Sequence, residues 1–276
     1  MIKTYKYFDI DYYPEHELLL WKIKSDGIPN FSLEGLKEFT AFANDLKMIL
    51  ADNGYPLKYI ASSSMHPEVY NMGGDLPFFF ENIINQNREV LTEYAHLCIE
   101  VIHNIYNSFG LPAISIALVE GNAYGGGFEC VAAHDIILAN NDAKFCLPEN
   151  KFNLFPGMGA YSFLFRKLNF KTASDVLYNG DIYDASQMKE LGLVNQIFKN
   201  NRGIDRLVEY INKTSYNFIY NHHKCLKRVF PLQKSELIDI TDIWVDACLN
   251  LDNKSLRRME LIINAQNRKL KQKVIK

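Results

Sequence analysis

The stretch GNAYGGGFE (residues 121–129) follows a run over residues 113–119 that is apolar except for Ser115. Such a run is typical of a strand that is covered on both faces. Three consecutive glycines stand where this strand would turn into a helix, and glycine lets a ligand approach the main chain closely. The first N–H groups of a helix have no partner within the helix and carry a partial positive charge. The stretch therefore favours a strand, a turn and a helix whose N–H groups can stabilise an oxyanion.

A second glycine-containing loop, YNMGGDL (residues 70–76), follows another expected strand at residues 57–61. Taken alone, each loop is explained more simply as a turn of the chain. A nucleotide-binding loop is a further alternative, but the glycines lack the spacing G-x-G-x-x-G, and no G-x-x-x-x-G-K-[ST] is present. Nucleotide binding is therefore set aside, and both loops stay candidates for an oxyanion hole.

Short apolar strands alternate with helical segments along the first half of the chain. Strands separated by helices call for parallel pairing with right-handed crossovers, which makes the fold class α/β. Beyond Gly157 the pattern is mostly helical, and we expect a core over residues 1–200 and a helical cap or oligomerisation region over 201–276. The strands are expected at residues 18–23, 57–61, 113–119, 136–139 and 194–198, and the first long helices at 31–50, capped by Asn30 or Ser32, and at 87–109.

The composition is that of an ordinary globular protein, with 276 residues of which 48% are hydrophobic. The net charge of −2 leaves no broad basic surface for a nucleic-acid backbone. The N-terminal residues do not resemble a signal peptide, and no apolar run is long enough to span a bilayer. Five scattered cysteines suit reduced thiols, and neither they nor His66, His103 and His134 have the spacing of zinc ligands. We therefore expect a cytoplasmic protein without a nucleic-acid partner, a membrane span, a metal or another cofactor.

Two glutamates stand in apolar surroundings near the second of these glycine turns. Glu129 follows the triple glycine directly, and Glu149 follows the segment Cys-Leu-Pro. A single glutamate in such a setting is usually ion-paired or peripheral. If both point into one pocket, however, desolvation and mutual repulsion raise at least one pKa, which leaves one carboxyl protonated and the other ionised near neutral pH. The pair would then supply a general acid and a general base.

With these motifs, the sequence resembles the crotonase (enoyl-CoA hydratase/isomerase) superfamily over nearly its whole length. The resemblance implies a crotonase fold, in which stacked ββα units form a spiral core with a C-terminal helical region. It implies that Glu129 and Glu149 are catalytic, beside an oxyanion hole made by the N–H groups of Gly126 and Met72, with Gly73 as the alternative to Met72. The neighbouring loop residues expected at the substrate are Gly74, Asp75 and Gly125.

Within the superfamily, the segments YNMGGDL (70–76), LPE (147–149) and LFPGMGAYSFL (154–164) look most like the branch that makes diffusible signal factors. Enzymes of that branch dehydrate a 3-hydroxyacyl-acyl carrier protein and then cleave the thioester, which releases a cis-2-unsaturated fatty acid for quorum sensing. The same resemblance suggests an acyl tunnel, although large apolar residues at helical spacing more often belong to the core. The candidate tunnel residues are Phe155, Met158, Phe163 and Trp244.

The identity of the thioester carrier depends on a segment that the resemblance does not cover. The Asn-Ala-Leu segment that helps the family to position coenzyme A has no clear counterpart between Ile23 and Leu36. Its absence favours an acyl carrier protein, which would meet basic residues of the C-terminal helices, namely Arg257, Arg258, Arg268, Lys269, Lys271 and Lys273. The alternatives are an enoyl-CoA hydratase that acts on coenzyme A thioesters and a non-catalytic acyl-binding or scaffold protein. By resemblance, we expect a homotrimer or a dimer of trimers.

Overall fold

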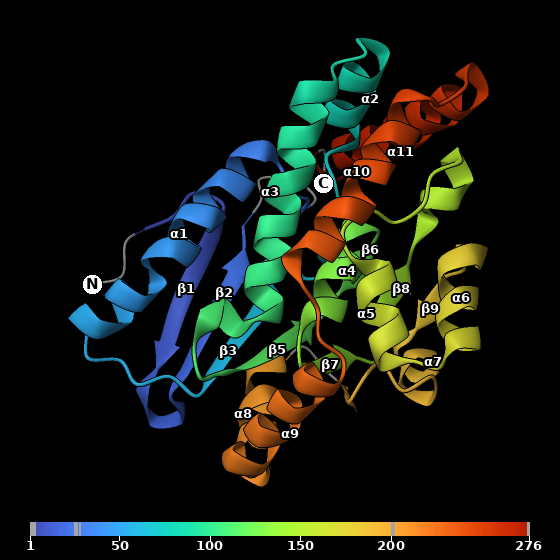
Figure 1. Ribbon diagram of the computed structural model, residues 1–276. Coiled ribbons are helices and arrows are strands. Elements are labelled where there is room, and N and C mark those ends of the chain that lie inside the picture. The colour runs from blue at the N-terminus through green and yellow to red at the C-terminus, as the bar shows by residue number, and fades with distance from the viewer. Residues whose placement is uncertain (1–3, 25–26, 28, 200–201, 275–276) are drawn as a thin grey trace.

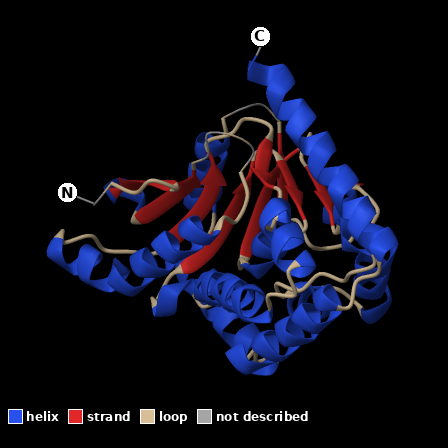
Figure 2. Cartoon of the chain, turned by 90° about the horizontal axis from the view of Figure 1, so that it is seen from above, coloured by secondary structure: helices blue, strands red, loops and turns tan. Residues whose placement is uncertain are grey.

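The computed structural model describes residues 4–24, 27, 29–199 and 202–274, with side chains as far as Asn264. The strands form two sheets, and helices pack around them (Figure 1, Figure 2). The larger sheet has six strands in the order β1-β2-β3-β5-β7-β10. Only β1 and β2 pair in antiparallel fashion within it. Its strands are β1 (Phe8–Tyr13), β2 (Leu18–Ile23), β3 (Tyr59–Ser64), β5 (Ile114–Val119), β7 (Ile136–Asn140) and β10 (Gln196–Phe198).

The smaller sheet carries the glycine turns. Its four strands lie in the order β4-β6-β8-β9, with parallel pairing except between β8 and β9. Each of the two glycine loops follows directly on one of its strands, β4 or β6, and these two strands are neighbours. The sheet therefore places the loops side by side. Its strands are β4 (Val69–Asn71), β6 (Asn122–Tyr124), β8 (Lys144–Cys146) and β9 (Tyr183–Asp184).

The inner strands of the larger sheet are buried on both faces, as the largely apolar run at residues 113–119 predicted. Leu19 and Trp21 of β2 belong to one hydrophobic cluster. Leu18 and Leu20 belong to the other, together with Leu207 of the C-terminal region. Successive side chains of a strand point to opposite faces, so a strand with no polar alternation needs apolar cover on both sides.

The C-terminal helices form two groups that pack against different parts of the core. In Figure 1, α8 and α9 lie below the main sheet, whereas α10 and α11 lie beside α2 and α3, near the smaller sheet. The helices are α1 (Leu33–Asp52), α2 (Leu76–Ile84), α3 (Arg88–Tyr106), α4 (Gly126–Ala133), α5 (Ala160–Lys167), α6 (Phe170–Asn179), α7 (Ala185–Glu190), α8 (Gly203–Lys213), α9 (Tyr216–Val229), α10 (Lys234–Leu249) and α11 (Asn253–Val274). Short 3-10 helices are η1 (Pro14–His16), η2 (Ser108–Gly110) and η3 (Pro148–Phe152).

The predicted elements of the core are confirmed, with a few corrections. The run at residues 18–23 is β2, and Ser32, rather than Asn30, caps α1 by accepting the Gly35 N–H at 3.2 Å. No strand was expected between residue 61 and the end of the loop at 70–76, but this segment contains the end of β3 and all of β4. The sequence also gave no sign of β8. Strands of three residues are too short to show a periodic pattern, which is why β4 and β8 were missed.

Parts of two predictions fall outside the described residues. The boundary predicted between the core and the C-terminal region lies at residues 200 and 201, which are not described. The side chains of Arg268, Lys269, Lys271 and Lys273 are not described either. Among the residues that are described, no helix is both long and apolar enough to cross a membrane.

Gly127, in the first turn of α4, tests how tightly the two glycine loops are packed. A Cβ at this position would overlap the carbonyl oxygen of Asn71 in the neighbouring strand β4. Replacing glycine by alanine within a helix normally stabilises a protein by about 0.5–1 kcal/mol. Here we expect Gly127→Ala to lower the free energy of unfolding by about 1–3 kcal/mol, because the backbone of β4 must move. Urea denaturation measures the difference.

Gly35→Ala is the matched control for this prediction. Gly35 also lies in the first turn of a helix, and its Cβ would meet the Ser32 hydroxyl at 3.0 Å rather than a backbone carbonyl. A side chain can shift by a few tenths of an ångström more easily than a strand can, so this variant should be close to neutral. Equal unfolding free energies for the two variants would contradict the packing argument.

Candidate active site

The second glycine loop places a free helix terminus beside a carboxylate. Gly125 precedes α4 with a φ of +52°, a left-handed conformation that favours glycine. A Cβ at Gly125 would lie 2.7 Å from Oε1 of Glu149. Gly126 is the first residue of α4, so its N–H has no acceptor within the helix. The N–H of Gly126 is therefore available to a ligand, as the sequence predicted.

The first glycine loop lies directly against the second. Gly73 has a φ of +89°, and a Cβ on it would lie 2.7 Å from the Gly126 nitrogen. The Met72 N–H donates to the Pro29 carbonyl at 2.8 Å, and the Gly73 N–H donates to Oδ1 of Asn71 at 2.7 Å. Either of the two predicted first-loop donors must therefore leave a protein acceptor before it can bind an oxyanion.

Glu129 is almost completely buried and is held by backbone donors. Its Oε1 accepts the Met158 N–H at 2.8 Å and the Ala160 N–H at 2.9 Å, both at the start of α5. The positive end of a helix and two N–H donors favour an ionised carboxylate. Burial works against this and raises the pKa of Glu129 above its ordinary value, although the two hydrogen bonds limit the rise.

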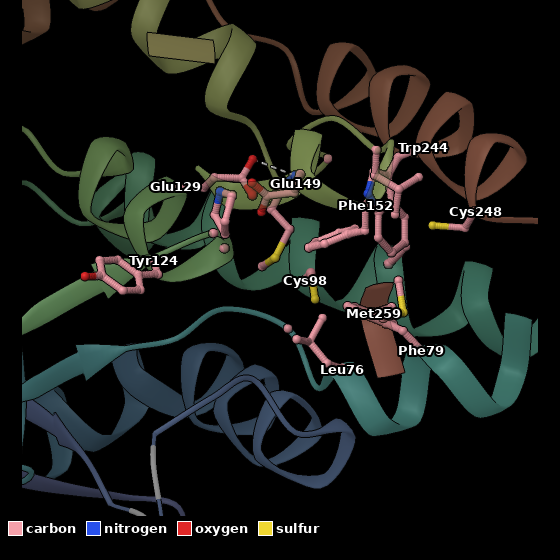
Figure 3. A pocket seen from close by; sticks show the side chains of 18 of the residues that line it. Leu76, Phe79, Cys98, Tyr124, Glu129, Glu149, Phe152, Trp244, Cys248 and Met259 are labelled. Atoms are coloured by element: carbon pink, nitrogen blue, oxygen red, sulfur yellow. Dashed lines mark hydrogen bonds between the residues drawn. The ribbon is translucent and has the colours of Figure 1, made fainter. Parts of the chain in front are cut away.

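Glu149 extends from η3 toward Glu129 and has weaker support. Figure 3 shows the two carboxyl groups next to each other. Oε2 of Glu149 is buried and has no hydrogen-bond partner within the described residues. Burial raises the pKa of Glu149, and the negative charge of Glu129 raises it further. The single proton that such a pair holds near neutral pH is therefore placed more favourably on Glu149.

The two carboxyl groups open onto an apolar cavity of about 280 Å³. In Figure 3 they lie at one end of it, and Phe79, Trp244, Cys248 and Met259 lie at the other. An elongated apolar space with polar groups at one end suits a ligand with a polar head and an apolar chain. Other lining residues are Met72, Gly74, Leu76, Ile83, Tyr94, Ala95, Cys98, Tyr124, Gly125, Gly126, Phe152, Leu154, Gly157, Met158, Thr241 and Ile262.

The cavity brings together most of the predicted site residues. Met72, Gly74, Gly125, Met158 and Trp244 all line it, with the two glutamates. Four predicted residues do not line it, namely Asp75, Gly73, Phe155 and Phe163. Phe155 packs its ring against Tyr161, and Phe163 packs its ring against Tyr106. Asp75 caps α2 by accepting the Phe78 N–H at 3.2 Å, and the Gly73 N–H donates to Oδ1 of Asn71.

Several lining residues were missed by the sequence analysis. Tyr94 and Cys98 of α3 lie one helical turn apart. On α10, Thr241, Trp244 and Cys248 follow one another at intervals of about one turn. Spacing of three or four residues marks one face of a helix, but it does not tell whether that face meets a core or a cavity. The apolar periodicity was visible, whereas its use as a cavity wall was not.

The charged groups of the site do not form a metal centre. No cluster of three or more His, Cys, Asp or Glu side chains suited to a metal ion occurs within the described part of the chain. Glu149, Glu129 and the Gly126 N–H instead place a proton donor, a proton acceptor and a helix N–H group at one end of an apolar cavity. This set is suited to proton transfer next to a carbonyl group.

A profile of the enoyl-CoA hydratase/isomerase family matches residues 59–249, which include both glycine loops and both glutamates. This protein belongs to that family. It is therefore an enzyme of acyl thioesters with a crotonase fold, made of two mixed sheets and C-terminal helices.

Solved structures of the family share the fold at low sequence identity. The enoyl-CoA hydratase of Bacillus halodurans is 21% identical, with a TM-score of 0.78 over 93% of this chain and 100% of that one. The human mitochondrial delta3-delta2-enoyl-CoA isomerase is 14% identical, with a TM-score of 0.77 over 96% and 99%. DspI of Pseudomonas aeruginosa is 19% identical, with a TM-score of 0.69 over 89% and 97%. At these sequence identities the likeness to the solved structures is one of fold alone.

The raised pKa of Glu149 leads to a testable dependence of stability on pH. A folded-state pKa above the unfolded value of about 4.3 contributes stability that is present below that value and is lost as the pH rises through the folded pKa. Glu149→Gln removes this titration. We expect the variant to lose less stability than the wild type between pH 5 and pH 9, by at least about 1.4 kcal/mol, the equivalent of one pKa unit.

Urea denaturation at both pH values measures the effect, with Glu190→Gln as the control. Glu190 is exposed at the end of α7, and its replacement should leave the pH dependence of the wild type unchanged. An identical pH dependence in Glu149→Gln and the wild type would show that Glu149 is not forced to hold a proton.

Proposed function

We propose that this protein dehydrates a 3-hydroxyacyl thioester bound to an acyl carrier protein and then hydrolyses the thioester, which releases a cis-2-unsaturated fatty acid signal. The observation that carries the first step is the pair of adjacent glutamates beside the Gly126 N–H, of which Glu129 is buried and Glu149 is half-buried with a buried Oε2. Mass spectrometry of the products formed from 3-hydroxyacyl-acyl carrier protein tests the proposal. A free 2-enoic acid supports both steps, and unchanged substrate rejects them.

Dehydration begins with removal of a proton from Cα of the thioester. This proton is weakly acidic, so the negative charge that develops on the carbonyl oxygen must be stabilised as it forms. The N–H of Gly126 is one donor, and the N–H of Met72 becomes the second once it exchanges the Pro29 carbonyl for the substrate. Loss of one such donor typically costs about 3 kcal/mol of transition-state stabilisation.

The surroundings of the two glutamates support a division of roles. Glu129, held by two backbone N–H groups, is favoured as the ionised base that takes the Cα proton. Glu149, which holds the shared proton more favourably than Glu129 does, is the acid that protonates the departing 3-hydroxyl. The C–O bond breaks, water leaves, and the Cα–Cβ double bond forms. The pair holds one proton before and after the step, because the proton of Glu149 leaves in the water and Glu129 gains the proton from Cα.

Thioester hydrolysis would use the same groups. An ionised glutamate takes a proton from water while the water oxygen attacks the carbonyl carbon. The oxygen of the tetrahedral intermediate then occupies the same oxyanion hole, and the carrier thiol leaves with a proton. The proposal of this second step, of the cis product and of a role in quorum sensing rests on the similarity of the segments at 70–76, 147–149 and 154–164 to diffusible signal factor synthases.

A hydratase acting on coenzyme A thioesters is the second candidate. It is favoured by the family match over residues 59–249, and hydration of a 2-enoyl thioester uses the same glutamates in the reverse direction. A non-catalytic acyl-binding or scaffold protein is the third. It would have no need for two adjacent buried carboxyl groups, whose repulsion and desolvation disfavour the fold.

The basic surface beside the cavity supports a carrier protein as the partner. Arg257 and Arg258 are exposed on α11, the helix that also contributes Met259 and Ile262 to the cavity. Lys151 is exposed and lines the cavity itself. An acidic carrier would be steered to these charges. We also propose, from the family resemblance, that the protein forms a homotrimer or a dimer of trimers.

Each glutamate should be needed for dehydration. We expect Glu129→Gln and Glu149→Gln each to lower the rate by about a hundredfold or more, which is the scale of general acid–base catalysis. Product formation is followed by mass spectrometry, and circular dichroism verifies that the variants fold. Glu190→Gln, on the exposed end of α7, is the surface control and should keep full activity. Near-normal turnover in either active-site variant would remove that residue from the mechanism.

Reversal of the basic charges should distinguish the two carriers. We expect Arg257→Glu combined with Arg258→Glu to raise the KM for the carrier-protein substrate at least about threefold more than the KM for the coenzyme A thioester. Turnover at low concentrations of the carrier-protein substrate should also fall as ionic strength rises, because salt screens charge steering.

A matched double reversal on another helix controls for net charge. Lys224 and Arg228 are exposed on α9, below the main sheet and apart from α11 in Figure 1. Lys224→Glu combined with Arg228→Glu should leave both KM values unchanged. Equal use of the two thioesters without any effect of salt would contradict the carrier-protein proposal and favour the hydratase.

A further inference from the structure

Asn71 occupies a position that connects the two glycine loops. It is the last residue of β4, directly before the first loop, and its exposed fraction is 0%. It does not line the acyl cavity, so it makes no contact with substrate there. Any influence that it has on the reaction must therefore pass through its neighbours.

Two contacts tie Asn71 to both sides of the proposed oxyanion hole. Oδ1 of its side chain accepts the Gly73 N–H at 2.7 Å. Its carbonyl oxygen packs so tightly against Gly127 of α4 that a Cβ there would overlap it. Gly73 in turn lies against the Gly126 nitrogen, 2.7 Å from where a Cβ of Gly73 would be. One residue thus controls the spacing between the first loop and the start of α4.

The Asn71 amide is difficult to explain as a contribution to stability. Its Nδ2 is buried and has no hydrogen-bond partner within the described residues. A buried unsatisfied polar group costs at least as much stability as one hydrogen bond, such as that to Gly73, contributes. An apolar side chain would therefore serve the core at least as well. The benefit of the amide lies in the conformation that it imposes on Gly73.

We propose that Asn71 is a positioning residue for the oxyanion hole. Its amide oxygen holds Gly73 in the left-handed conformation, with a φ of +89°, and so aims the first loop at the oxygen that Gly126 also binds. Because this bond occupies the Gly73 N–H, the first-loop donor in this proposal is the Met72 N–H, once it leaves the Pro29 carbonyl. The inference rests on the proposed function, because it concerns the enolate oxygen formed in that reaction.

Three variants separate positioning from folding. Asn71→Ala removes the acceptor. Asn71→Ser keeps a weaker one, because a serine hydroxyl can bond the N–H two residues further on. Asn140→Ala is the matched control, since Asn140 is 5% exposed at the end of β7 and its Oδ1 accepts the Asp142 N–H at 3.1 Å in the same kind of turn. Asn140 does not line the cavity.

We expect Asn71→Ala to lower kcat for dehydration by about 10- to 100-fold, because a displaced donor acts on the transition state more than on the bound substrate. KM should change less than about threefold. Asn71→Ser should lie between Asn71→Ala and the wild type, and Asn140→Ala should resemble the wild type. A loss caused by general destabilisation would affect Asn71→Ala and Asn140→Ala alike.

A binding experiment provides a readout that does not depend on turnover. A 3-ketoacyl thioester forms an enolate whose charge is shared between the thioester oxygen and the 3-keto oxygen, and the enolate is followed by its ultraviolet absorbance. Asn71→Ala should weaken formation of the bound enolate about tenfold or more, and it should leave the affinity for a saturated acyl thioester of the same length nearly unchanged.

The outcomes distinguish this inference from the function on which it rests. If the wild type is active and Asn71→Ala has the kcat of Asn140→Ala, the positioning role is wrong and the dehydratase stands. The same conclusion follows if enolate formation and saturated-thioester binding fall equally. If the wild type neither turns over nor binds any acyl thioester, the proposed function fails and the positioning role fails with it.

Discussion

The close approach of two stretches of main chain is the constraint on which the site depends. Gly73 and Gly126 come so near to each other that a single additional carbon on Gly73 would lie 2.7 Å from the Gly126 nitrogen. Glycine is required at this contact because a side chain on either loop would push the two main chains apart and block a ligand from their N–H groups. The parallel pairing of β4 with β6 brings the loops together, and α4 starts at the point of contact. Strands of three residues thus determine where the reaction takes place.

The two glutamates add an electrostatic cost that the fold tolerates. Glu129 receives two N–H bonds from the start of α5, but Oε2 of Glu149 receives none from the described residues. Unequal support drives the pKa values of two neighbouring carboxyl groups apart, and this difference makes one of them an acid and the other a base at the same pH. An arrangement optimised for stability alone would neutralise or solvate both groups. The asymmetry therefore belongs to the chemistry of an acyl-thioester enzyme.

The C-terminal helices complete the cavity and connect it to the surface. Trp244 and Cys248 of α10 and Met259 of α11 form the end opposite the glutamates. The same α11 carries Arg257 and Arg258 outward, so one helix both covers the acyl chain and presents charge beside it. A change in the buried face of this helix would therefore alter the cavity, whereas a change in its exposed face alters only the charge beside it.

The sequence by itself indicated five strands of the larger sheet, the long helices α1 and α3, and both glutamates and Gly126 as candidates for the site, because apolar runs, glycine clusters and carboxylates in apolar segments are local signals. It also indicated Met158 and Trp244, though only by resemblance. Tertiary structure alone decided that Phe155 packs on Tyr161 and that the Met72 N–H meets Pro29. It alone showed the unequal support of Glu129 and Glu149, and the use of Tyr94 and Cys98 as cavity wall. These facts depend on contacts between residues far apart in the chain, and periodicity reveals that a helix face is apolar without revealing what it faces.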